Sequence, residues 1–391
     1  MDWKTLPAWT YANDEFFALE GEAIFMRTWQ MVGHLCDIPE AGDYLRFDLL
    51  AESAIVVRGH DGNVRAFHNV CRHRAFRLVD GAGGHCQVLI RCRYHGFAYA
   101  FDGALKAVPA AEEFEGLDFD RFGLKPIDIE IWRGFIFVRF AGDGPSVAEQ
   151  FASVAAELDA YRFDQLEPCG NGMGTPMAAD WKVAIDNNIE GYHIPVAHPA
   201  LQRLYGHRYR FVVHPLGVSH AGGPLRDTDG STWSERHYLR LLPEVAHLPE
   251  ERQRFWGYYS MFPNLAFDVY PDLIDFFQIL PLAPGRSISR WRAYALRDER
   301  REMRAARWLN MRINAWTTDE DRHLVEGVQA GLGSRSYETG VLSRKEARVR
   351  QFHDMVRAAV PVAALDRAPA RGSIAEVNAD MSRQATSAVA R

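Results

Sequence analysis

Residues 180–199 read Asp-Trp-Lys-Val-Ala-Ile-Asp-Asn-Asn-Ile-Glu-Gly-Tyr-His-Ile-Pro-Val-Ala-His-Pro, and the rest of the chain is interpreted around them. The pattern predicts a helix over residues 180–192, on which Glu190 and His193 share one face because they lie three positions apart. A proline then ends the helix, which lets His198 fold back towards His193. Two imidazoles beside a carboxylate suit a divalent transition metal such as iron, but a third ligand must come from elsewhere.

The same histidines are compatible with two different roles. Both could be ordinary surface or core residues with satisfied hydrogen bonds. They could also belong to a di-iron carboxylate site, which uses Glu-x-x-His pairs on four long helices. The sequence has three such pairs: Glu190/His193, Glu244/His247 and Glu320/His323. Prolines on both sides of the second pair exclude a long helix there, which argues against the di-iron site.

Length, charge and cysteine content limit the class of protein. The chain has 391 residues, enough for two or three domains with a large core. Its net charge of −6 disfavours nucleic acid as a partner. No apolar run approaches the ~20 residues of a membrane span, and the N-terminus lacks a signal-peptide pattern. The five cysteines, an odd number, indicate reduced thiols and a cytoplasmic location.

Changes in pattern along the chain predict four parts. Residues 1–30 are expected to form a helical segment that packs on the second large domain. Residues 31–145 alternate short β-rich runs with Asp-Gly turns, which is typical of an all-β module. Residues 146–365 mix strand-like runs with late helices rich in Arg and Glu. Residues 366–391 have little apolar content, so a mobile tail is expected there.

The β module carries a second candidate metal motif. Cys71-Arg-His73 is followed after eighteen residues by Cys92-Arg-Tyr-His95. Two thiolates and two imidazoles can bind either zinc or an iron–sulfur cluster. A zinc finger normally pairs its cysteines together and its histidines together, whereas each short loop here offers one of each. This arrangement favours a [2Fe–2S] cluster, with Cys71 and Cys92 on one iron and His73 and His95 on the other.

Asn69-Val-Cys-Arg-His-Arg and Cys92-Arg-Tyr-His-Gly-Phe resemble the cluster motif of Rieske non-haem iron oxygenases, specifically the α (large, catalytic) subunit of the aromatic ring-hydroxylating oxygenases. The resemblance covers about residues 20–360 and continues through Trp181-Lys182, Asp186-Asn187, Glu190-x-x-His193 and His198-Pro199. It implies an α+β fold: an all-β Rieske [2Fe–2S] domain plus a helix-grip (START/Bet v1-like) catalytic domain, with an antiparallel sheet and covering helices.

The resemblance also implies a mononuclear Fe(II) held by His193, His198 and one carboxylate from a late helix. That helix is expected to begin at Thr317. Asp321 is expected to face inward because it lies three and four residues before apolar positions, whereas Asp319 faces water. Alternatively, these acids could be present only because acids favour a helix N-terminus.

A bridging acid three residues before the first iron-ligating histidine is a further property of the family. It connects that histidine with a cluster histidine of a neighbouring subunit, which implies a homo-oligomer, expected to be a homotrimer. Most members have Asp at this position, whereas this sequence has Glu190. Ala75 stands where Gly is usual and Phe97 where Trp is common, but neither departure removes a ligand.

The implied function is that of a terminal oxygenase component, as in aromatic hydrocarbon catabolism. It would take electrons from a NAD(P)H-dependent reductase, with or without a ferredoxin, and use O₂ to mono- or dioxygenate a small aromatic substrate. An alternative is N- or O-demethylation of a quaternary ammonium or methoxy-aromatic compound. An alternative of another class is a non-catalytic Rieske electron carrier or redox sensor. The expected substrate pocket comprises Asp186, Tyr258, Phe262, Asn264 and Phe267.

Overall fold

The structure, a computed structural model, describes residues 3–227 and 230–389. Within them the chain divides into two compact units. One unit runs from Met26 to Val147; the other combines the chain up to Phe25 with the chain from Ala148 onward. The first two and last two positions of the predicted terminal segments lie outside the described residues.

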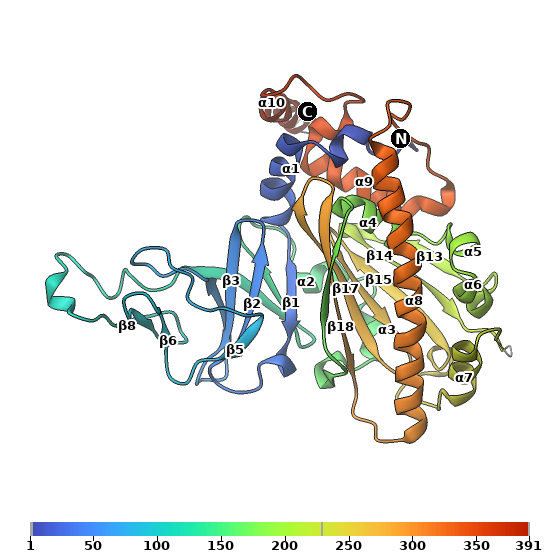
Figure 1. The fold of residues 1–391 in the computed structure, drawn as a ribbon, viewed down its shortest axis with the longest axis horizontal. Helices are drawn as coiled ribbons and strands as arrows, with labels where there is room; N and C mark the ends of the chain where they lie inside the picture. Colours follow the sequence, from blue (N-terminus) through green and yellow to red (C-terminus); the bar gives the residue numbers. More distant parts are fainter. Residues whose placement is uncertain (1–2, 228–229, 390–391) are drawn as a thin grey trace. The chain divides into compact units, whose positions relative to one another are not determined.

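Antiparallel strands dominate the unit Met26–Val147, which we call the Rieske unit because it carries the two loops that resemble the Rieske motif (Figure 1). One sheet has the order β1-β10-β9-β4-β3-β2-β5, and a smaller sheet has the order β6-β7-β8. The Asp-Gly signals are confirmed as turns, since Gly62 and Gly103 have φ of +80° and +87°, which glycine adopts without strain. The strands are β1 Gln30–His34, β2 Asp43–Leu49, β3 Glu52–Arg58, β4 Val64–His68, β5 Gly83–His85, β6 Ile90–Arg91, β7 Ala98–Tyr99, β8 Leu105–Ala107, β9 Pro126–Trp132 and β10 Phe135–Arg139.

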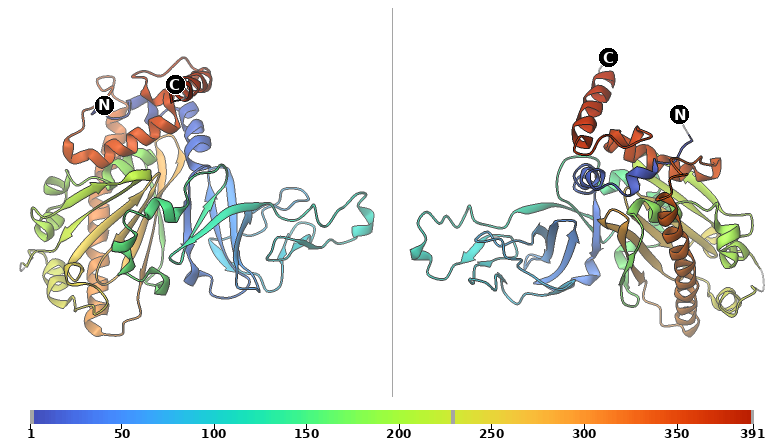
Figure 2. Two further views of the ribbon diagram at one scale, coloured as in Figure 1. Left: turned by 180° about the vertical axis from the view of Figure 1, so that it is seen from behind. Right: turned by 45° about the horizontal axis from the view of Figure 1, so that its top comes forward.

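The second unit, which we call the catalytic unit, contains an antiparallel sheet in the order β11-β18-β17-β16-β15-β14-β13, with β12 also paired to β18. Helices cover this sheet (Figure 2), so the expected antiparallel sheet with covering helices is confirmed. The strands are β11 Glu167–Pro168, β12 Met173–Met177, β13 Arg210–Val213, β14 Val218–Pro224, β15 Phe255–Met261, β16 Leu265–Val269, β17 Ile274–Ala283 and β18 Arg286–Ala295.

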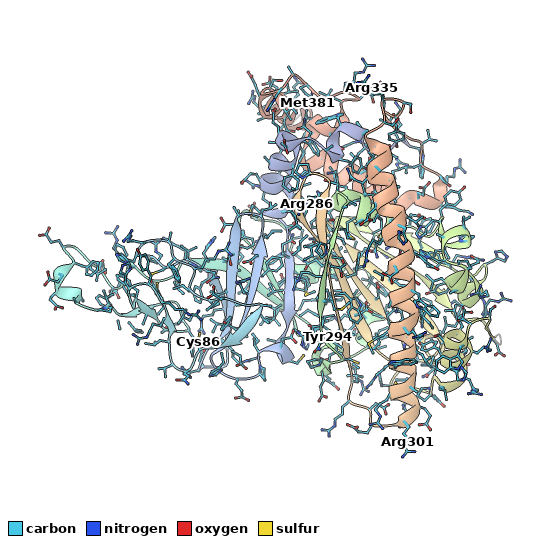
Figure 3. All side chains as sticks on the ribbon, in the orientation of Figure 1. Cys86, Arg286, Tyr294, Arg301, Arg335 and Met381 are labelled. Carbon is cyan, nitrogen blue, oxygen red and sulfur yellow. The ribbon has the colours of Figure 1, made fainter. Side chains whose placement is uncertain are left out.

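The helix α8, Arg301–Leu332, lies across the sheet, and Figure 3 labels Arg301 at one end and Arg335 just beyond the other. Its buried stripe runs through Met303, Ala306 and Ile313 at the three- and four-residue spacing of one helical face. Between Ile313 and Val325 the same face of α8 carries polar side chains, and a cavity lies between this part of the helix and the sheet. The helices are α1 Asp14–Glu20, α2 Val147–Phe151, α3 Ala155–Asp159, α4 Trp181–Asn188, α5 Ile194–Ala197, α6 Pro199–Tyr205, α7 Trp233–Leu241, α8 Arg301–Leu332, α9 Ala347–Ala359 and α10 Ile374–Val389.

Two helix predictions near the histidine stretch were wrong in their bounds. The helix predicted over 180–192 ends at Asn188, and Pro195 lies in the first turn of the next helix, α5, rather than ending the previous one. The late helix begins at Arg301, not at Thr317. The Thr317 hydroxyl donates to the carbonyl four residues earlier, so this residue continues the helix instead of capping it.

The two ends of the described chain both belong to the catalytic unit. Lys182 Nζ lies 2.7 Å from Glu20 Oε1, and also 2.7 Å from Asp180 Oδ1, with all three side chains buried. This ion pair fixes the end of α1 against the start of α4. At the other end, the tail expected to be mobile instead contains α10, which lies beside α1 with Ile374 fully buried (Figures 1 and 2).

Candidate functional site

Two loops of the Rieske unit bring Cys71, His73, Cys92 and His95 together. The two thiols are buried, with 3% and 2% exposure, and their side chains lie within hydrogen-bonding contact of each other. The two imidazoles are more accessible, with ring centroids 4.7 Å apart. Two thiols inside and two imidazoles outside form separate pairs, which fits a cluster of two irons better than one tetrahedral zinc.

The two loops repeat one backbone pattern. In each loop, the cysteine amide donates to the carbonyl of the residue five positions later, at 2.8 Å. The cysteine carbonyl accepts from the amide of the residue four positions later, at 3.0 Å. Those fourth positions are Ala75 and Gly96, with φ of +58° and +80°. Glycine adopts this conformation freely, whereas alanine is strained by its Cβ. The departure at Ala75 therefore keeps the loop shape but stores strain.

Partial burial, with the nearby charges of His95 and Arg74, lowers the pKa of His73. The shift favours the neutral imidazole, which is the form that binds a metal. Cys86, labelled in Figure 3, instead packs against the apolar core of the Rieske unit, and His85 pairs with Asp43 at 2.8 Å. Neither Cys86 nor His85 is therefore a candidate ligand of the cluster.

In the catalytic unit, His193, His198 and Asp321 converge. Their ligand atoms all lie within 4.8 Å of one another. The two Nε2 atoms are 3.0 Å apart, and Asp321 Oδ1 lies 2.9 Å from Nε2 of His198 and 3.6 Å from Nε2 of His193. Three ligands at ~2.1 Å and right angles would be about 3.0 Å apart. The donor set and its spacing therefore fit a metal held on one face, as in a two-histidine, one-carboxylate site.

Carboxylates also orient both imidazoles from behind. Nδ1 of His193 donates to Glu190, and Nδ1 of His198 donates to Glu320 Oε2 at 2.7 Å. With Nδ1 protonated, each Nε2 keeps its lone pair for a metal. Burial alone would lower the pKa of His198, but its hydrogen bonds with Asp321 and Glu320 outweigh burial and raise the pKa.

The backbone between α4 and α5 places Glu190 and His193 without a regular helix. The Gly191 Cα faces the ring of Tyr209, and a Cβ there would lie 2.4 Å from Cε1 of that ring. Only glycine fits this approach. Asn187, on the last turn of α4, donates to Asp321 Oδ1 at 3.0 Å and so ties α4 to α8 beside the three converging side chains.

A cavity of about 130 Å³ opens beside these three residues. One wall is α8, where Asn314, Thr317 and Thr318 replace the apolar stripe. The floor is the sheet, which contributes aromatic rings and two acids. The aromatic and acidic side chains that line it from the sheet strands or from positions directly beside them are Tyr209, Tyr258, Asp268, Tyr270, Asp275, Phe277 and Trp291.

Of the five expected pocket residues, only Tyr258 lines this cavity. Phe267 points to the opposite face of the sheet, where it packs against Phe151 and Phe163, because successive residues of a strand alternate between faces. Phe262 lies beyond the end of β15 and packs against Phe352. These two positions were predicted wrongly because the register of the strand, not its aromatic content, decides which side chains face the cavity.

Asn264 and Asp186 serve other contacts. Asn264 is buried, and its Nδ2 donates to the Ile279 carbonyl at 2.8 Å, so it closes a strand connection. Asp186 accepts from His353 at 2.8 Å and from the Tyr11 hydroxyl at 3.1 Å. It lines a second cavity, to which Asn187 also contributes. Neither residue lines the cavity beside Asp321.

Sequence reasoning missed Asp268, Asp275 and the role of Glu320. The two aspartates had a usable signal, because each is an acid inside a mostly apolar strand run, Leu265–Val269 and Ile274–Leu280. A buried acid in a strand usually has a function or a partner. Glu320 was noted only as part of a Glu-x-x-His pair, and nothing local in the sequence indicates that its carboxylate contacts His198.

Among the described residues, no helix is both long and apolar enough to cross a membrane.

Comparisons with known proteins agree with this geometry. A family model described as the ring hydroxylating alpha subunit (catalytic domain) matches residues 153–361, and one described as the Rieske [2Fe–2S] domain matches residues 28–125. The glycine betaine monooxygenase oxygenase subunit of Pseudomonas aeruginosa is 35% identical over 393 residues, covering 87% of this chain and 85% of the relative. The carnitine monooxygenase oxygenase subunit of Escherichia coli is 27% identical over 350 residues, covering 85% of each.

A solved structure of a quaternary ammonium Rieske monooxygenase superimposes with a TM-score of 0.77 at 23% identity, over 90% of this chain and 95% of that chain, which shows a shared fold. The two matched domains imply a Rieske [2Fe–2S] cluster and a mononuclear iron as cofactors, with O₂ as co-substrate and a reductase as the source of electrons. Because the catalytic-domain model spans more than half of the chain, the expected resemblance is confirmed: this chain belongs to the Rieske ring-hydroxylating oxygenase α-subunit family and is an oxidoreductase.

Proposed function

We propose that this oxygenase acts on a small quaternary ammonium compound and removes an N-methyl group. The observation that carries the proposal is the cavity beside Asp321, which is small and lined by Tyr209, Tyr258, Phe277 and Trp291. Aromatic faces attract a quaternary ammonium through cation–π contacts, which are strongest where water is excluded. The names of the glycine betaine and carnitine relatives point to the same class of substrate.

For the metal centres, the proposal assigns Cys71, His73, Cys92 and His95 to the [2Fe–2S] cluster. It assigns His193, His198 and Asp321 to the mononuclear iron. The paired burial of the thiols and the spacing of the three converging donor atoms support these assignments. When bound, the two centres supply electron transfer and dioxygen activation.

The protein side chains position the reaction. Glu190 and Glu320 hold the two imidazoles with Nε2 towards the metal position, and Asn187 orients the Asp321 carboxylate. The rings hold the ammonium so that one methyl group is presented, and they limit the access of water to it. One oxygen atom of O₂ enters a methyl C–H bond, while two electrons and two protons convert the other to water. The N-hydroxymethyl product then releases formaldehyde and a proton, leaving a tertiary amine.

Glu190 is assigned the bridging role between metal centres, with a cluster histidine of a neighbouring subunit as its second contact. Support comes from its carboxylate, which already accepts from Nδ1 of His193 and is only 12% exposed. The same role makes a homotrimer our proposed assembly. A reductase that oxidises NADH or NADPH, alone or through a ferredoxin, is the proposed electron donor.

Hydroxylation of a small aromatic compound is the second candidate. A cavity lined with aromatic rings also accepts a flat ring by stacking. The two buried acids on its floor favour a cation over a neutral or acidic aromatic, because an apolar ligand would leave both carboxylates without a partner.

Oxygen uptake dependent on NADH and a surrogate reductase tests the proposal. Glycine betaine, carnitine, choline and a panel of aromatic acids would be compared, with formaldehyde measured against oxygen consumed. We expect one formaldehyde per O₂ with a trimethylammonium substrate. Hydroxylated product from an aromatic acid alone would replace the proposal with the second candidate. Two irons per chain instead of three, without oxygen uptake, would indicate an electron carrier or sensor.

A further inference from the structure

Two aspartates face each other on the floor of the cavity. Asp268 on β16 and Asp275 on β17 are direct partners in the antiparallel register, and Tyr258 on β15 is the partner of Asp268 on its other side. Side chains directly opposite one another project to the same face of a sheet, with Cβ atoms ~5 Å apart. All three line the cavity. The floor is therefore a row of one phenol and two carboxyl groups.

Neither carboxyl group is neutralised within the part of the chain that the structure describes. Oδ1 of Asp268 and Oδ1 of Asp275 are both buried without a hydrogen-bond partner. Asp275 is only 2% exposed, and its one side-chain hydrogen bond comes from Trp291. Burying a carboxyl group without a partner costs free energy of folding. A ligand that supplies the partner would offset that cost in the bound state.

Basic side chains near the cavity make no ion pair with the two aspartates within the described residues. The buried Arg348 acts on Asp268 through space; its guanidinium donates to Ser219 at 2.9 Å and to Ser260 at 2.7 Å, and its Nη1 has no hydrogen-bond partner. Arg322, on the α8 wall, lies 3.5 Å from the exposed Asp319. The cavity floor thus carries a potential negative charge without a fixed counter-charge in contact.

Burial raises the pKa of Asp268 to about 7 and raises that of Asp275 well above its ordinary value, with the charge of Asp268 as the second cause for Asp275. The other titratable or charged groups that act on the pair are Tyr205, Tyr209, Tyr258, Tyr270, Asp272 and Arg348. Glu190, His193, His198, Asp321 and Arg322 face the same cavity from the histidine segment and from α8. None of the four tyrosines is ionised near neutral pH, because burial raises all their pKa values. The pair therefore takes up protons more readily than two exposed carboxyl groups would.

We propose that Asp268 and Asp275 form the site that recognises the positive charge of the substrate, so that the enzyme selects an organic ammonium by its charge and not only by the shape of its methyl groups. This inference rests on the proposed function and deepens it. The aromatic rings supply the contact surface, and the carboxylates supply the discrimination against an uncharged molecule of the same shape.

Proton release follows from this arrangement. A bound ammonium stabilises the ionised carboxylate, so binding expels a proton from the pair. Affinity for the cation should rise with pH through about 7, where Asp268 titrates, and should fall as the solution becomes more acidic. The affinity for an uncharged ligand should not change with pH in this way.

Calorimetric titration of the holoenzyme with choline and with its tert-butyl analogue, in which carbon replaces the ammonium nitrogen, tests the inference. The same comparison with glycine betaine and its tert-butyl analogue covers a zwitterionic ligand. We expect the wild-type protein to bind at least one trimethylammonium probe about 10-fold or more tightly than its analogue. Asp275→Asn and Asp268→Asn should each remove most of that preference and flatten its pH dependence, with little change for the analogue.

Asp319→Asn is the matched control, because it removes the same charge from an exposed position outside the cavity lining and should keep the preference. Asparagine still accepts from Trp291, so the cluster absorption and melting temperature of Asp275→Asn should stay near wild type. Equal affinity for probe and analogue, or an unchanged preference in both Asn variants, overturns the inference even if trimethylammonium turnover stands. A charge-dependent preference without turnover supports the cation site and contradicts the proposed function. Absence of binding by both trimethylammonium probes overturns both.

Discussion

The two candidate metal sites are built in opposite ways. The cluster side chains come from two short loops within residues 71–97, and each loop is closed by its own backbone hydrogen bonds. The iron side chains come from segments 123 residues apart, since Asp321 lies within α8 while His198 lies between α5 and α6. The cluster site is thus set by local backbone, whereas the iron site depends on how two distant helices pack. The following changes test that contrast, from the largest expected effect to the smallest.

Asp321→Ala should abolish the iron site and leave the cluster site intact. We expect loss of the mononuclear iron and a fall in turnover on the order of 10³-fold, because one carboxylate ligand is removed. Iron analysis and the rhombic EPR signal of the reduced cluster separate the two sites. Asp319→Ala, two positions away and 68% exposed, is the control. An inactive Asp319→Ala with an active Asp321→Ala would reverse the ligand assignment.

Glu190→Gln should keep both metals but slow communication between them. The amide has nearly the same size and still forms hydrogen bonds, but it lacks the negative charge. Stopped-flow oxidation of pre-reduced protein, with substrate and oxygen present, should be about 10- to 100-fold slower. An unchanged rate would refute the bridge. Loss of the mononuclear iron would instead make Glu190 a ligand and reopen the role of Asp321.

Glu320→Gln should weaken iron binding without removing a ligand. Its carboxylate accepts from Nδ1 of His198 at 2.7 Å, and such outer partners are worth about 10- to 100-fold in metal affinity. The measurement is the chelator concentration that removes half of the mononuclear iron, with the cluster absorption as an internal reference. Glu326→Gln, on the same helix but bonded to a backbone amide at 3.4 Å, provides the control. Identical chelator curves for the two variants would contradict an orienting role.

Ala75→Gly should stabilise the Rieske unit slightly. Alanine at φ +58° is strained, and relief of that strain is worth about 0.5–1 kcal/mol. The reciprocal Gly96→Ala should destabilise, because its Cβ would also lie 2.9 Å from Pro109 Cγ. Thermal melting followed by the visible circular dichroism of the cluster reports both changes. A lower melting temperature for Ala75→Gly would show that the two loops are not equivalent.

Local patterns in the sequence were informative where function is built locally. The Cys-x-His and Cys-x-x-His loops predicted four side chains that the structure brings together, since a short loop has few other ways to place them. His193 and His198 were found for the same reason. Asp321 was selected by its helical face, although the start of the helix was wrong, because facing depends on spacing and not on where the helix begins.

Long-range features were harder to predict. The aromatic run that begins at Phe255 gave no register, and a shift of one residue moves every side chain to the other face of a sheet. Tyr258 lines the cavity as expected, whereas Phe267 was expected there and its neighbour Asp268, which the sequence analysis did not single out, lines the cavity instead. The helix α10 was missed because its own sequence is polar; Ile374 and contacts with α1, from the far end of the chain, stabilise it.

The ion pair between Glu20 and Lys182 sets an order of events during synthesis. The ribosome completes Glu20 before the Rieske unit and reaches Lys182 only after that unit has been made. Until then the segment up to Phe25 has no site to dock on, and Phe16 and Phe25 stay exposed to water. The Rieske unit can fold first as an insertion between two halves of its neighbour. An excised fragment beginning at Ala148 would lack both the Glu20 carboxylate that pairs with Lys182 and the rings of Tyr11 and Phe16 that cover it, so a cut at Ala148 removes part of the catalytic unit.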